Sequence, residues 1–485
     1  MYSFNFKIIT QLVGALLLIV GSMMAVSLSW AFYYGEEWQP LAVSAILTTG
    51  AGLGIRFIFV KAPKKDLTRS DGYLMVTLGW VFMSLFGTLP YLLSGAIPGF
   101  INAFFETMSG ISTTGATILT DIEALPKYLL FWRSMTHWIG GMGIIVLTVA
   151  ILPLLGIGGM QLFVAEAPGV TTDKLHPRIT ETAKRLWLIY VALTSLETIL
   201  LKVAGMGWFD AINHAMSTMA SGGFSTKNNS VAFFQEPVIH YIIIVFMFLA
   251  GVNFTLIYLG LSGKLKAVWR NEEFRVYSIN IIILATITSL CLAFMTNIPV
   301  EEAFRNGFFQ IISLITTTGL ITDDYLQWPN FLMFLCFVLF FSGGSTGSTA
   351  GGIKMMRTIL LIKNSLTELR RQLHPNAILP VRLSGKAVPQ KITNTVAAFV
   401  LIWLIIFFLG SLILSAMGID FMTAAGATAA CLGNVGPAIG TVGPVSNYAH
   451  MPDLSKVFLA FLMLLGRLEL FTVLVLFSPY FWTHR

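Results

Sequence analysis

Oxygen-bearing side chains and glycines gather in a few short segments of an otherwise apolar chain. One such segment, MSGISTTGATIL (108–119), contains the hydroxyl residues Ser112, Thr113, Thr114 and Thr117 together with two glycines. Polar backbone and hydroxyl groups are costly in hydrocarbon unless they are hydrogen-bonded or line an aqueous cavity. Hydroxyl and carbonyl oxygens can also replace the water shell of a dehydrated cation. The segment is therefore typical of either close helix packing or a cation-coordinating loop.

The same segment recurs three more times along the chain. Its copies align without gaps as MSGISTTGA (108–116), MSTMASGGF (216–224), ISLITTTGL (312–320) and AACLGNVGP (429–437). They share Gly115, Gly223, Gly319 and Gly436, at spacings of 108, 96 and 117 residues. Thirteen positions before these glycines stand residue types favoured as helix N-caps, namely Asn102, Asp210, Asn306 and Thr423. Four aligned copies, each after a short capped helix, favour a functional loop over simple packing.

Four re-entrant loops around one axis would present rings of backbone carbonyls to a cation. Glycine at each turn permits the backbone angles that direct carbonyls inward. The loops add hydroxyl oxygens from Thr113, Thr114, Ser221, Thr317 and Thr318, and an amide from Asn434. No carboxylate lies within two residues before any of the four glycines. This pattern predicts a monovalent, weakly hydrated cation rather than calcium, which prefers acidic ligands.

The composition places these loops in a membrane. Of the 485 residues, 56% are hydrophobic and 11% are charged, and the mean hydropathy is +0.78. A soluble protein of this length would carry roughly a quarter charged residues. The net charge of +7 resides in short loops between apolar runs, which indicates an orientation signal rather than a nucleic-acid-binding face. The three cysteines lie in apolar surroundings and are expected to be packing residues.

The elements that position the loops are long apolar runs, each able to cross a hydrocarbon core of ~30 Å as a helix. The runs fall near 8–33, 41–60, 73–96, 129–155, 186–206, 238–261, 276–297, 329–362, 394–417 and 455–478. They predict an all-α polytopic membrane protein built from a span, a short pore helix, a glycine loop and a second span, repeated four times around one pore. The expected units are an N-terminal helix pair (1–61) and pore repeats at 62–156, 157–263, 264–364 and 365–485.

Loop charge predicts the orientation of the spans. Lysines and arginines concentrate in the loops 62–72, 157–184, 263–274 and 364–392, whereas the opposite loops carry mainly acidic residues. The basic loops should face the cytoplasm, which places both termini inside. The first apolar run resembles a secretory signal, but it continues past Trp30 and a second span follows at once, so we expect an uncleaved helix.

A second polar segment, SGGSTGSTAGG (342–352), interrupts the run 329–362. A helix through it would lose roughly 1 kcal/mol per glycine, so we predict a break that is stable only beside a water-filled cavity. A phosphate-binding P-loop is excluded because Ile353 stands between the last glycine and Lys354. Arg467 lies in the middle of the last run, where an arginine costs at least ~2.5 kcal/mol and should face protein or pore.

Several motifs together resemble one family. They are TTGAT (113–117), FWRSMTHWIGGMGI (131–144), GGFST (222–226), GSTAGGIK (347–354), HPNA (374–377) and GRLELFT (466–472). On these residues the chain resembles the potassium-uptake subunits of the Trk/Ktr/HKT superfamily, in the bacterial TrkH/TrkG branch, over nearly its whole length. Two loops depart from the family pattern, since the fourth reads GNVGPA where relatives often have paired asparagines and the third reads TTTG where many have TTAG.

The resemblance implies a potassium-selective filter made by four pseudo-equivalent loops, with potassium as the transported ion and no organic cofactor in this chain. The filter residues carried over are Thr113, Thr114, Gly115, Ser221, Gly222, Gly223, Thr317, Thr318, Gly319, Asn434, Val435 and Gly436. It also implies that Arg467 lies near the intramembrane loop beneath the filter. From the glycine-rich break and this arginine we predict a gate made by Gly343, Gly344, Ser345, Thr346, Gly347, Ser348, Gly351, Gly352 and Arg467. The implied location is the bacterial inner membrane, with lipid around the chain.

Two partners follow from the resemblance. One is a second copy of the chain in a homodimer. The other is a cytosolic NAD- or nucleotide-binding regulatory subunit of the TrkA type, for which the basic segment NSLTELRRQLHPNA (364–377) offers a docking surface. The residues leave open whether flux is channel-like or coupled to protons or sodium, and which nucleotide regulates it.

Some polar residues admit two interpretations. Glu106, inside the first pore helix, is expected to anchor that helix more than to bind an ion. His137 and His214 favour packing over a proton relay, and Asp323 with Asp324 would either draw cations to the outer mouth or form a solvated pair. No catalytic triad order, Walker A sequence or zinc spacing is present in the sequence, so we expect no enzyme activity. The rival function is a proton- or sodium-coupled solute carrier, which also has many helices and internal repeats.

Overall fold

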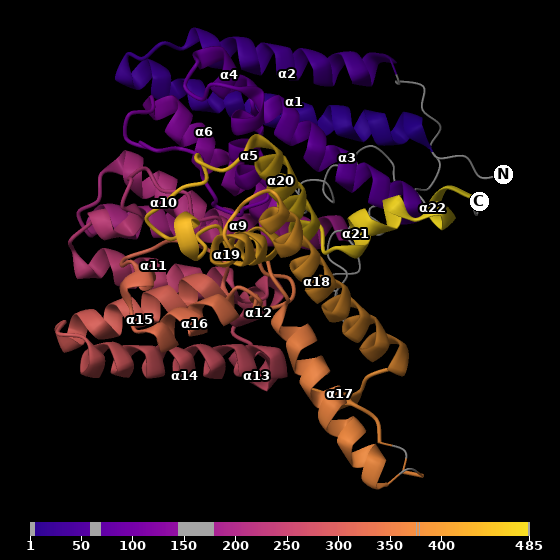
Figure 1. Ribbon diagram of the computed structural model, residues 1–485. Helices are drawn as coiled ribbons and strands as arrows, with labels where there is room; N and C mark the ends of the chain where they lie inside the picture. The colour runs from indigo at the N-terminus through magenta and orange to yellow at the C-terminus, as the bar shows by residue number, and fades with distance from the viewer. Residues whose placement is uncertain (1–4, 59–68, 144–178, 375, 378, 484–485) are drawn as a thin grey trace.

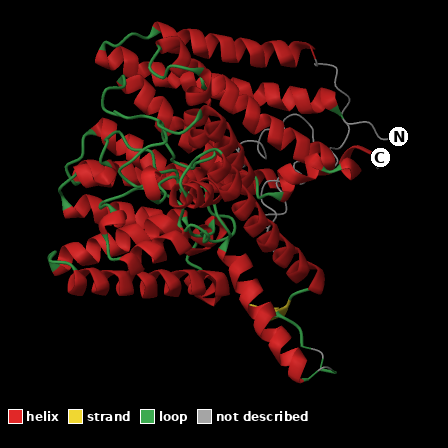
Figure 2. Ribbon diagram, in the orientation of Figure 1, coloured by secondary structure: helices red, strands yellow, loops and turns green. Residues whose placement is uncertain are grey.

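The protein is a bundle of helices in which four repeats surround a central group of short helices (Figure 1). The computed structural model describes residues 5–58, 69–143, 179–374, 376–377 and 379–483. Apart from one two-stranded hairpin, the described elements are helical (Figure 2). The predicted class, an all-α polytopic membrane protein with four repeats and an N-terminal helix pair, is confirmed.

The N-terminal pair and the first repeat lie along one edge of the bundle (Figure 1). Helices α1 (Phe6–Tyr34) and α2 (Gln39–Ile58) form the pair, and α1 also packs against α3 (Arg69–Gly87). The first repeat continues with α4 (Leu89–Ser94), the short pore helix α5 (Phe100–Ile111), α6 (Lys127–Trp138) and a π-helical turn at Ile139–Gly143.

The remaining repeats follow the same order of span, pore helix, loop and span. The second contains α9 (Ile179–Val203), α10 (Trp208–Ala220), a 3₁₀ turn (Ser230–Phe233), α11 (Pro237–Ala250), α12 (Phe254–Leu261) and α13 (Leu265–Arg270). The third contains α14 (Glu272–Met295), α15 (Val300–Ile315), a 3₁₀ turn (Tyr325–Gln327), α16 (Asn330–Leu339) and α17 (Met355–Leu373). The hairpin of β1 (Arg382–Leu383) and β2 (Lys386–Ala387) precedes the fourth repeat. This repeat begins with α18 (Gln390–Ala416), the pore helix α19 (Phe421–Gly433) and a 3₁₀ turn (Gly440–Val442). It ends with α20 (Asp453–Arg467), α21 (Phe471–Leu474), a 3₁₀ turn (Val475–Phe477) and α22 (Pro479–Thr483).

The described residues include six helices long and apolar enough to cross a membrane, and two bent helix pairs that together reach that length. The pairs are α11 with α12, bent by 107°, and α20 with α21, bent by 111°. Among the predicted runs, 329–362 is not one span, because α16 ends at Leu339 and α17 begins only at Met355. The second part of the run 129–155, and most of the basic loops 62–72 and 157–184, lie outside the described residues.

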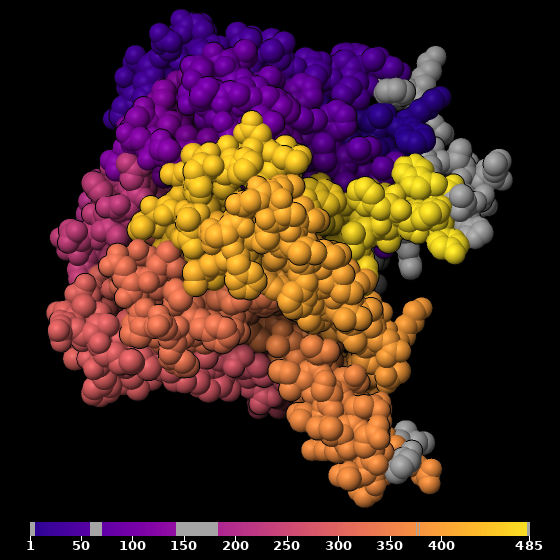
Figure 3. All heavy atoms as spheres, viewed as in Figure 1, coloured from indigo at the N-terminus to yellow at the C-terminus, as the bar shows by residue number. Residues whose placement is uncertain are grey.

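The pore helices α5, α10, α15 and α19 occupy the centre of the fold. Helix α19 is buried from Thr423 to Gly433, and its small residues allow neighbouring helices to approach closely. At the periphery, α17 projects from the body together with the end of α18 that it contacts (Figure 3). The start of α1 and helix α22 lie at the same end of the bundle (Figure 1).

The expected N-caps of the pore helices are wrong. The helices begin earlier, at Phe100, Trp208, Val300 and Phe421, so the four polar residues lie inside them. Glycine or proline precedes the first three helices, and Asp420 caps the fourth by accepting a hydrogen bond from the amide of Thr423. The polar side chains instead bind residues beyond the glycine loops: Asp210 accepts from Thr226, Asn306 from Thr322, Asn102 from Lys456, and Thr423 from the amide of Thr441.

Candidate functional site

Each pore helix ends in the same backbone turn. The residue two positions before the glycine adopts a left-handed conformation, with φ of 52° at Thr113, 57° at Ser221, 54° at Thr317 and 54° at Asn434. The next amide bonds back to the helix, from Thr114 to the carbonyl of Ser109, Gly222 to Ser217, Thr318 to Ser313 and Val435 to Ala430, at 2.8–2.9 Å. This is the Schellman arrangement, which satisfies the last carbonyls of a helix and turns the chain sharply.

The glycine after each turn also has a positive φ, of 83° at Gly115, 86° at Gly223, 72° at Gly319 and 90° at Gly436. A side chain in this region is strained. Each of the four loops therefore contains a left-handed residue and, two positions later, a glycine with a positive φ. We refer to these segments, 113–116, 221–224, 317–320 and 434–437, as the glycine loops.

The glycine loops contact one another in a closed ring. A Cβ atom on Gly115 would overlap the carbonyl oxygen of Gly222, one on Gly223 that of Thr318, one on Gly319 that of Val435, and one on Gly436 that of Thr114. In every case the carbonyl belongs to the residue immediately before the glycine of the next loop, and the fourth loop returns to the first. Glycine is thus required by contact between repeats as well as by its own backbone angles.

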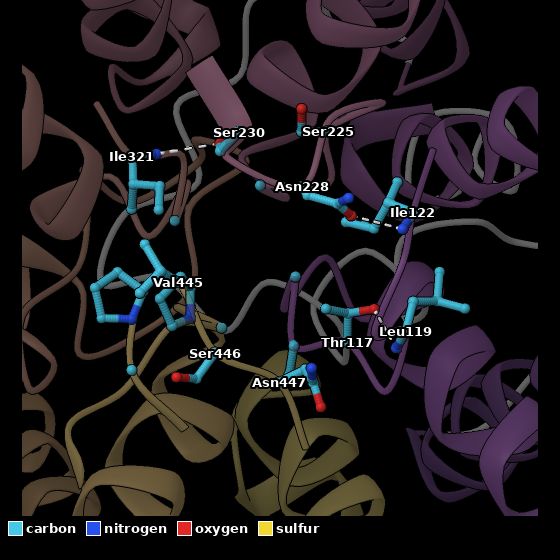
Figure 4. Close-up of a pocket in the computed structure, with 18 of the residues that line it drawn as sticks. Thr117, Leu119, Ile122, Ser225, Asn228, Ser230, Ile321, Val445, Ser446 and Asn447 are labelled. Carbon is cyan, nitrogen blue, oxygen red and sulfur yellow. Dashed lines mark hydrogen bonds between the residues drawn. The ribbon is translucent and has the colours of Figure 1, made fainter. Parts of the chain in front are cut away.

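An outer pocket opens above this ring and is lined by residues of all four repeats (Figure 4). The four glycines lie at its floor together with the segments that follow them. Hydrogen bonds tie neighbouring repeats around the pocket, because Asn228 accepts from the amide of Ile122 at 2.6 Å and Ser230 from the amide of Ile321 at 3.3 Å. The arrangement encloses one axis rather than a cleft between two halves.

The charged residues that line the pocket are basic, and both are paired. Arg133 lies 2.6 Å from Glu106, and Lys227 lies 3.5 Å from Glu123. Close to this second pair, a hydrogen bond from Asn228 holds the pKa of the Asp121 carboxyl below its ordinary value. Because both cations are paired with carboxylates, little uncompensated positive charge remains to repel a cation from the oxygens of the glycine loops.

Glu106 and Arg133 form a buried tie between the first and second repeats. Glu106 accepts hydrogen bonds from Thr117 and from the amide of Ile118 at 3.0 Å, and Arg133 donates to the carbonyl of Ser225 at 2.9 Å. The guanidinium also lies 3.5 Å from the ring centre of Phe224. These contacts place Glu106 in the role of a structural anchor, which was the favoured interpretation.

The two histidines also pack around the glycine loops. His137 contacts the carbonyl of Gly110 at 2.8 Å through Nδ1 and receives a hydrogen bond from the amide of Phe224 at 3.2 Å through Nε2. His214 lies 2.9 Å from the hydroxyl of Ser225. His137 therefore connects the first pore helix to the second glycine loop, and His214 connects the second pore helix to the residue that follows that loop.

Asp323 and Asp324 do not line the outer pocket. Asp323 accepts hydrogen bonds from the indole of Trp328 at 2.7 Å and from the amide of Asp324 at 2.8 Å. Asp324 accepts from the amide of Leu326 and so caps the 3₁₀ turn at Tyr325–Gln327. The hydrogen bonds of Asp323 and Asp324 thus explain the positions of both carboxylates without a bound cation.

Below the glycine loops lies the segment 340–354, which connects α16 to α17 and which we call the intramembrane loop. Ser221 and Thr317, the left-handed residues of the second and third glycine loops, contact it directly. The hydroxyl of Ser221 is 2.9 Å from that of Thr349, and Thr317 accepts from the amide of Gly351 at 2.6 Å. There is no room for a Cβ atom on Gly351, because it would approach Asn434 to 2.8 Å.

The intramembrane loop also fills the break between α11 and α12. Ser345 donates its amide to the carbonyl of Gly251 at 2.8 Å, and Gly347 accepts from the amide of Phe254 at 3.1 Å. Thr349 donates its hydroxyl to the carbonyls of Met219 and Ala250, at 3.0 and 3.2 Å. The break between α11 and α12 and the break between α16 and α17 each leave backbone amides and carbonyls without helical partners. These groups thus form hydrogen bonds with one another.

Arg467 reaches the intramembrane loop from the fourth repeat. Its guanidinium donates to the carbonyl of Thr349 at 2.8 Å and to those of Gly140 and Gly141 at 2.6 and 2.8 Å. The two glycine carbonyls are available because the backbone of Gly141 departs from helical geometry within the π-helical turn. Three carbonyl acceptors offset the burial of this cation.

Some of the side-chain oxygens expected to coordinate a cation already take part in hydrogen bonds within the protein, and others do not. The hydroxyl of Thr114 bonds to Ser112 and Asn434, and that of Thr318 bonds to Thr316. Within the described part of the chain, the Thr113 hydroxyl and the Asn434 Oδ1 are buried without a hydrogen-bond partner. These two oxygens, with the ring carbonyls, are available to a dehydrated cation.

Sequence reasoning missed several residues of this site. Thr349 lies within the segment 342–352 but was not among the expected gate residues, and it makes the most contacts there with the second repeat. The paired Gly140 and Gly141 inside an apolar run were the available signal for a helix break that frees carbonyls. The pairing of Arg133 with Glu106 has no local sequence signal, because the two lie on different helices.

Comparison with known proteins places this geometry in a family. The family model TrkH, described as a cation transport protein, matches residues 47–483. TrkH from Salmonella typhimurium, a Trk system potassium uptake protein, is 42% identical over 99% of both chains, and TrkG from Escherichia coli is 34% identical over 98% of both. The fold matches the crystal structure of the potassium transporter TrkH from Vibrio parahaemolyticus with a TM-score of 0.88 and 36% identity, over 98% of this chain and 99% of that one. The chain is therefore an integral membrane protein that belongs to the TrkH family of cation transport proteins, as a TrkH/TrkG-type subunit.

Proposed function

We propose that this protein takes up potassium across the bacterial inner membrane, with the four glycine loops as its selectivity filter. The observation that carries the proposal is the closed ring in which each filter glycine contacts the carbonyl-bearing residue of the next loop. Carbonyls arranged around one axis can replace the hydration shell of a potassium ion. The names of the relatives, Trk system potassium uptake proteins, support the same ion.

The absence of acidic ligands in the glycine loops supports a monovalent ion. The residues proposed to surround the path are the filter set predicted from the sequence, from Thr113–Gly115 to Asn434–Gly436. In the described residues no group of three or more histidine, cysteine, aspartate or glutamate side chains is placed to hold a metal ion. Potassium, which binds carbonyl oxygens, is proposed as the transported ion.

The intramembrane loop, with Arg467, is proposed as the gate. It lies directly below the filter, where the loop contacts Ser221 and Thr317, and a cation that leaves the filter inward would meet it. Its glycines and hydroxyl residues allow a non-helical backbone that can rearrange. A gate of this kind opens when the hydrogen bonds that hold the loop are exchanged for others.

A cytosolic nucleotide-binding partner of the TrkA type is proposed to move the gate, and a second copy of the chain to form a homodimer. Arg370, Arg382 and Lys386 are exposed where α17 and the hairpin project from the body. Ile362, Leu366, Leu369 and Leu373 form an exposed apolar stripe along α17, with the spacing of a helix–helix seam. The basic residues suit an acidic regulatory surface, and the stripe suits another helix of the same kind.

The competing function, a coupled solute carrier, is disfavoured by the symmetry of the site. Carriers typically bind their substrate between two inverted halves, whereas here four loops of the same orientation close around one axis. An uptake assay tests the choice. We expect rubidium and potassium uptake in a bacterial strain that lacks its own uptake systems, at micromolar to millimolar external ion. Uptake of an organic solute without rubidium would overturn the proposal.

The proposed orientation places both termini and the basic loops in the cytoplasm. Single cysteines at Lys266 and Lys386, in a background without the native cysteines, should react with an impermeant thiol reagent only from the inner side. Strong labelling of either position from outside intact cells would contradict this orientation.

A further inference from the structure

A single carboxylate joins the middle of the intramembrane loop to the start of α17. Glu273, in the first turn of α14, accepts the amide of Thr346 at 2.7 Å and the amide of Met356 at 3.1 Å, both through Oε1. The residue is 2% exposed. The amide of Met355 bonds to the carbonyl of Gly344 at 3.0 Å, which brings the two ends of the loop together at the same place. Glu273 therefore ties the middle of the loop to the first turn of α17.

Both donors in this contact are backbone amides, which need an acceptor oxygen. Met356 is at the start of α17, where unpaired amides and the helix dipole attract negative charge. Hydrogen bonds from amides to a carboxylate are stronger than those to a neutral carbonyl. A glutamine at this position would retain the accepting oxygen but lose the charge, whereas an alanine would lose both.

The preceding residue, Glu272, binds a different part of the molecule. Its Oε2 accepts the amide of Ser384 at 2.7 Å, in the turn of the β1–β2 hairpin, and its own amide donates to the Ser384 hydroxyl at 3.3 Å. Its Oε1 pairs with Lys363 of α17, which also donates to the carbonyl of Arg382 at 2.9 Å. Glu272 therefore fixes the exposed hairpin to the start of α14.

Glu272 and Glu273 cannot move independently, because they are consecutive residues of one helical turn. Asn271 caps that turn by accepting the amide of Phe274 at 2.9 Å. A displacement of the hairpin that pulls on Glu272 would thus also displace the oxygen that holds Thr346 and Met356. The intramembrane loop has further contacts with Arg467 and Ser221, but those come from the pore side of the loop.

We propose that Glu273 is a positioning residue that holds the intramembrane loop beneath the filter. Glu272 connects Glu273 to the β1–β2 hairpin, so that a protein docked on the hairpin releases the loop by displacing both glutamates. The proposal rests on the assignment of this loop as the gate. It adds the route by which a surface outside the bundle reaches the gate: hairpin, Glu272, Glu273, loop.

The test uses the full chain in potassium-loaded proteoliposomes, with two readouts. The first is the initial rate of rubidium uptake without any partner protein. The second is the rate at which a thiol reagent modifies a cysteine at Ser345, a loop residue that is 1% exposed, in a background without the native cysteines. Glu273→Ala should raise both rates roughly tenfold, as expected for the loss of hydrogen bonds to a charged group. Glu273→Gln should raise them less.

Glu272→Ala tests the connection to the hairpin, and Glu301→Gln serves as the matched control. Glu301 pairs with Arg305 at the exposed start of α15, outside the intramembrane loop, the hairpin and the proposed docking segment 364–377. The control should leave both rates unchanged, while Glu272→Ala should raise labelling of the Ser345 cysteine. If Glu273→Ala leaves labelling and uptake at the parent level, Glu273 does not position the loop. If only Glu272→Ala is silent, the connection to the hairpin is wrong.

Failure of this inference is distinguishable from failure of the gate assignment. Labelling of the Ser345 cysteine reports the position of the loop whether or not the loop controls flux. Increased labelling without increased uptake, together with no effect of Arg467→Ala on uptake, would show that the loop moves but is not the gate. Increased uptake in Arg467→Ala with no change in Glu273→Ala would retain the gate and reject the role of Glu273.

Discussion

The hydroxyl of Thr349, in the intramembrane loop, lies 2.9 Å from the hydroxyl of Ser221, in the second glycine loop. The same threonine hydroxyl contacts the carbonyls of Met219 and Ala250. One side chain thus joins the proposed gate to the proposed filter and to the break between α11 and α12. A change in the loop must alter the surroundings of a filter residue, so gating and ion selectivity should be coupled at this point.

Thr349→Val should weaken this connection at nearly constant shape. It removes a hydroxyl and leaves the carbonyl of Met219 and the hydroxyl of Ser221 without this partner, which costs about 1–3 kcal/mol in the closed arrangement. We expect rubidium flux without a partner protein to rise severalfold and the preference for potassium over sodium to fall. Thr367→Val is a suitable control, because its hydroxyl bonds only within α17. Unchanged flux and selectivity in Thr349→Val would show that the contact has no functional part.

The filter glycines offer a sharper test, because the chain contains a control for backbone strain. Gly319→Ser would place a Cβ atom against the carbonyl of Val435 at a φ of 72°, whereas Gly418→Ser has a φ of 88° and no neighbour within 4 Å. Both changes strain the backbone, but only the first disturbs the ring. Gly319→Ser should reduce potassium over sodium selectivity or conduction while the protein still inserts. Equal selectivity in both variants would reject the filter role of Gly319.

The buried pair of Glu106 and Arg133 should contribute strongly to stability when only one partner is removed. Arg133→Gln leaves a carboxylate buried without its cation, and breaking such a pair typically costs 3–5 kcal/mol, so we expect a loss of about that size in the free energy of unfolding. The double variant with Glu106→Gln should recover most of it, since no charge remains buried. Glu368→Gln, which removes the exposed partner of Arg371, should cost less than about 1 kcal/mol. Denaturant titration in detergent measures these differences, and equal losses in Arg133→Gln and Glu368→Gln would contradict the anchor role.

The glycine loops could be predicted from the sequence because their backbone requirement is local. A φ of 72–90° strongly favours glycine, so Gly115, Gly223, Gly319 and Gly436 stand at recurring positions that an ungapped alignment finds. The break at 342–352 was predictable for the same reason, since five glycines oppose a helix. Local chemistry also favoured N-caps at Asn102 and Asp210, and this was wrong because Gly99 and Gly207 start those helices sooner.

Contacts between separate elements could not be predicted, because they depend on which elements meet in space. The overlap of each glycine with a carbonyl of the next loop, the pairing of Arg133 with Glu106, and the two amides held by Glu273 all join residues from different elements. A buried arginine or glutamate in a span signals that a partner exists but does not identify it. Arg467 illustrates the limit: its position facing protein or pore is expected from the sequence, whereas its acceptors Gly140 and Gly141 are not.

Arg467 provides the most direct test of the gate. Its guanidinium joins the carbonyl of Thr349 in the loop to those of Gly140 and Gly141 in the first repeat, so it fixes the loop across the proposed ion path. Arg467→Ala removes this bridge, and a hydrogen bond from a charged group contributes about 1.5–3 kcal/mol. Since 1.4 kcal/mol corresponds to a tenfold change in an equilibrium, the open population should rise roughly tenfold to a hundredfold.

Uptake of rubidium by proteoliposomes, with and without the cytosolic partner, measures this effect. Arg467→Ala and a shortened loop lacking 345–350 should both conduct faster than the parent and depend less on the partner. Arg467→Lys should give an intermediate rate, because an ammonium keeps the charge but lacks the planar fork that reaches two repeats at once. If Arg467→Ala and the shortened loop insert normally and conduct no faster than the parent, the intramembrane loop does not obstruct the path, and the contacts of Arg467 serve only to hold the helix breaks together.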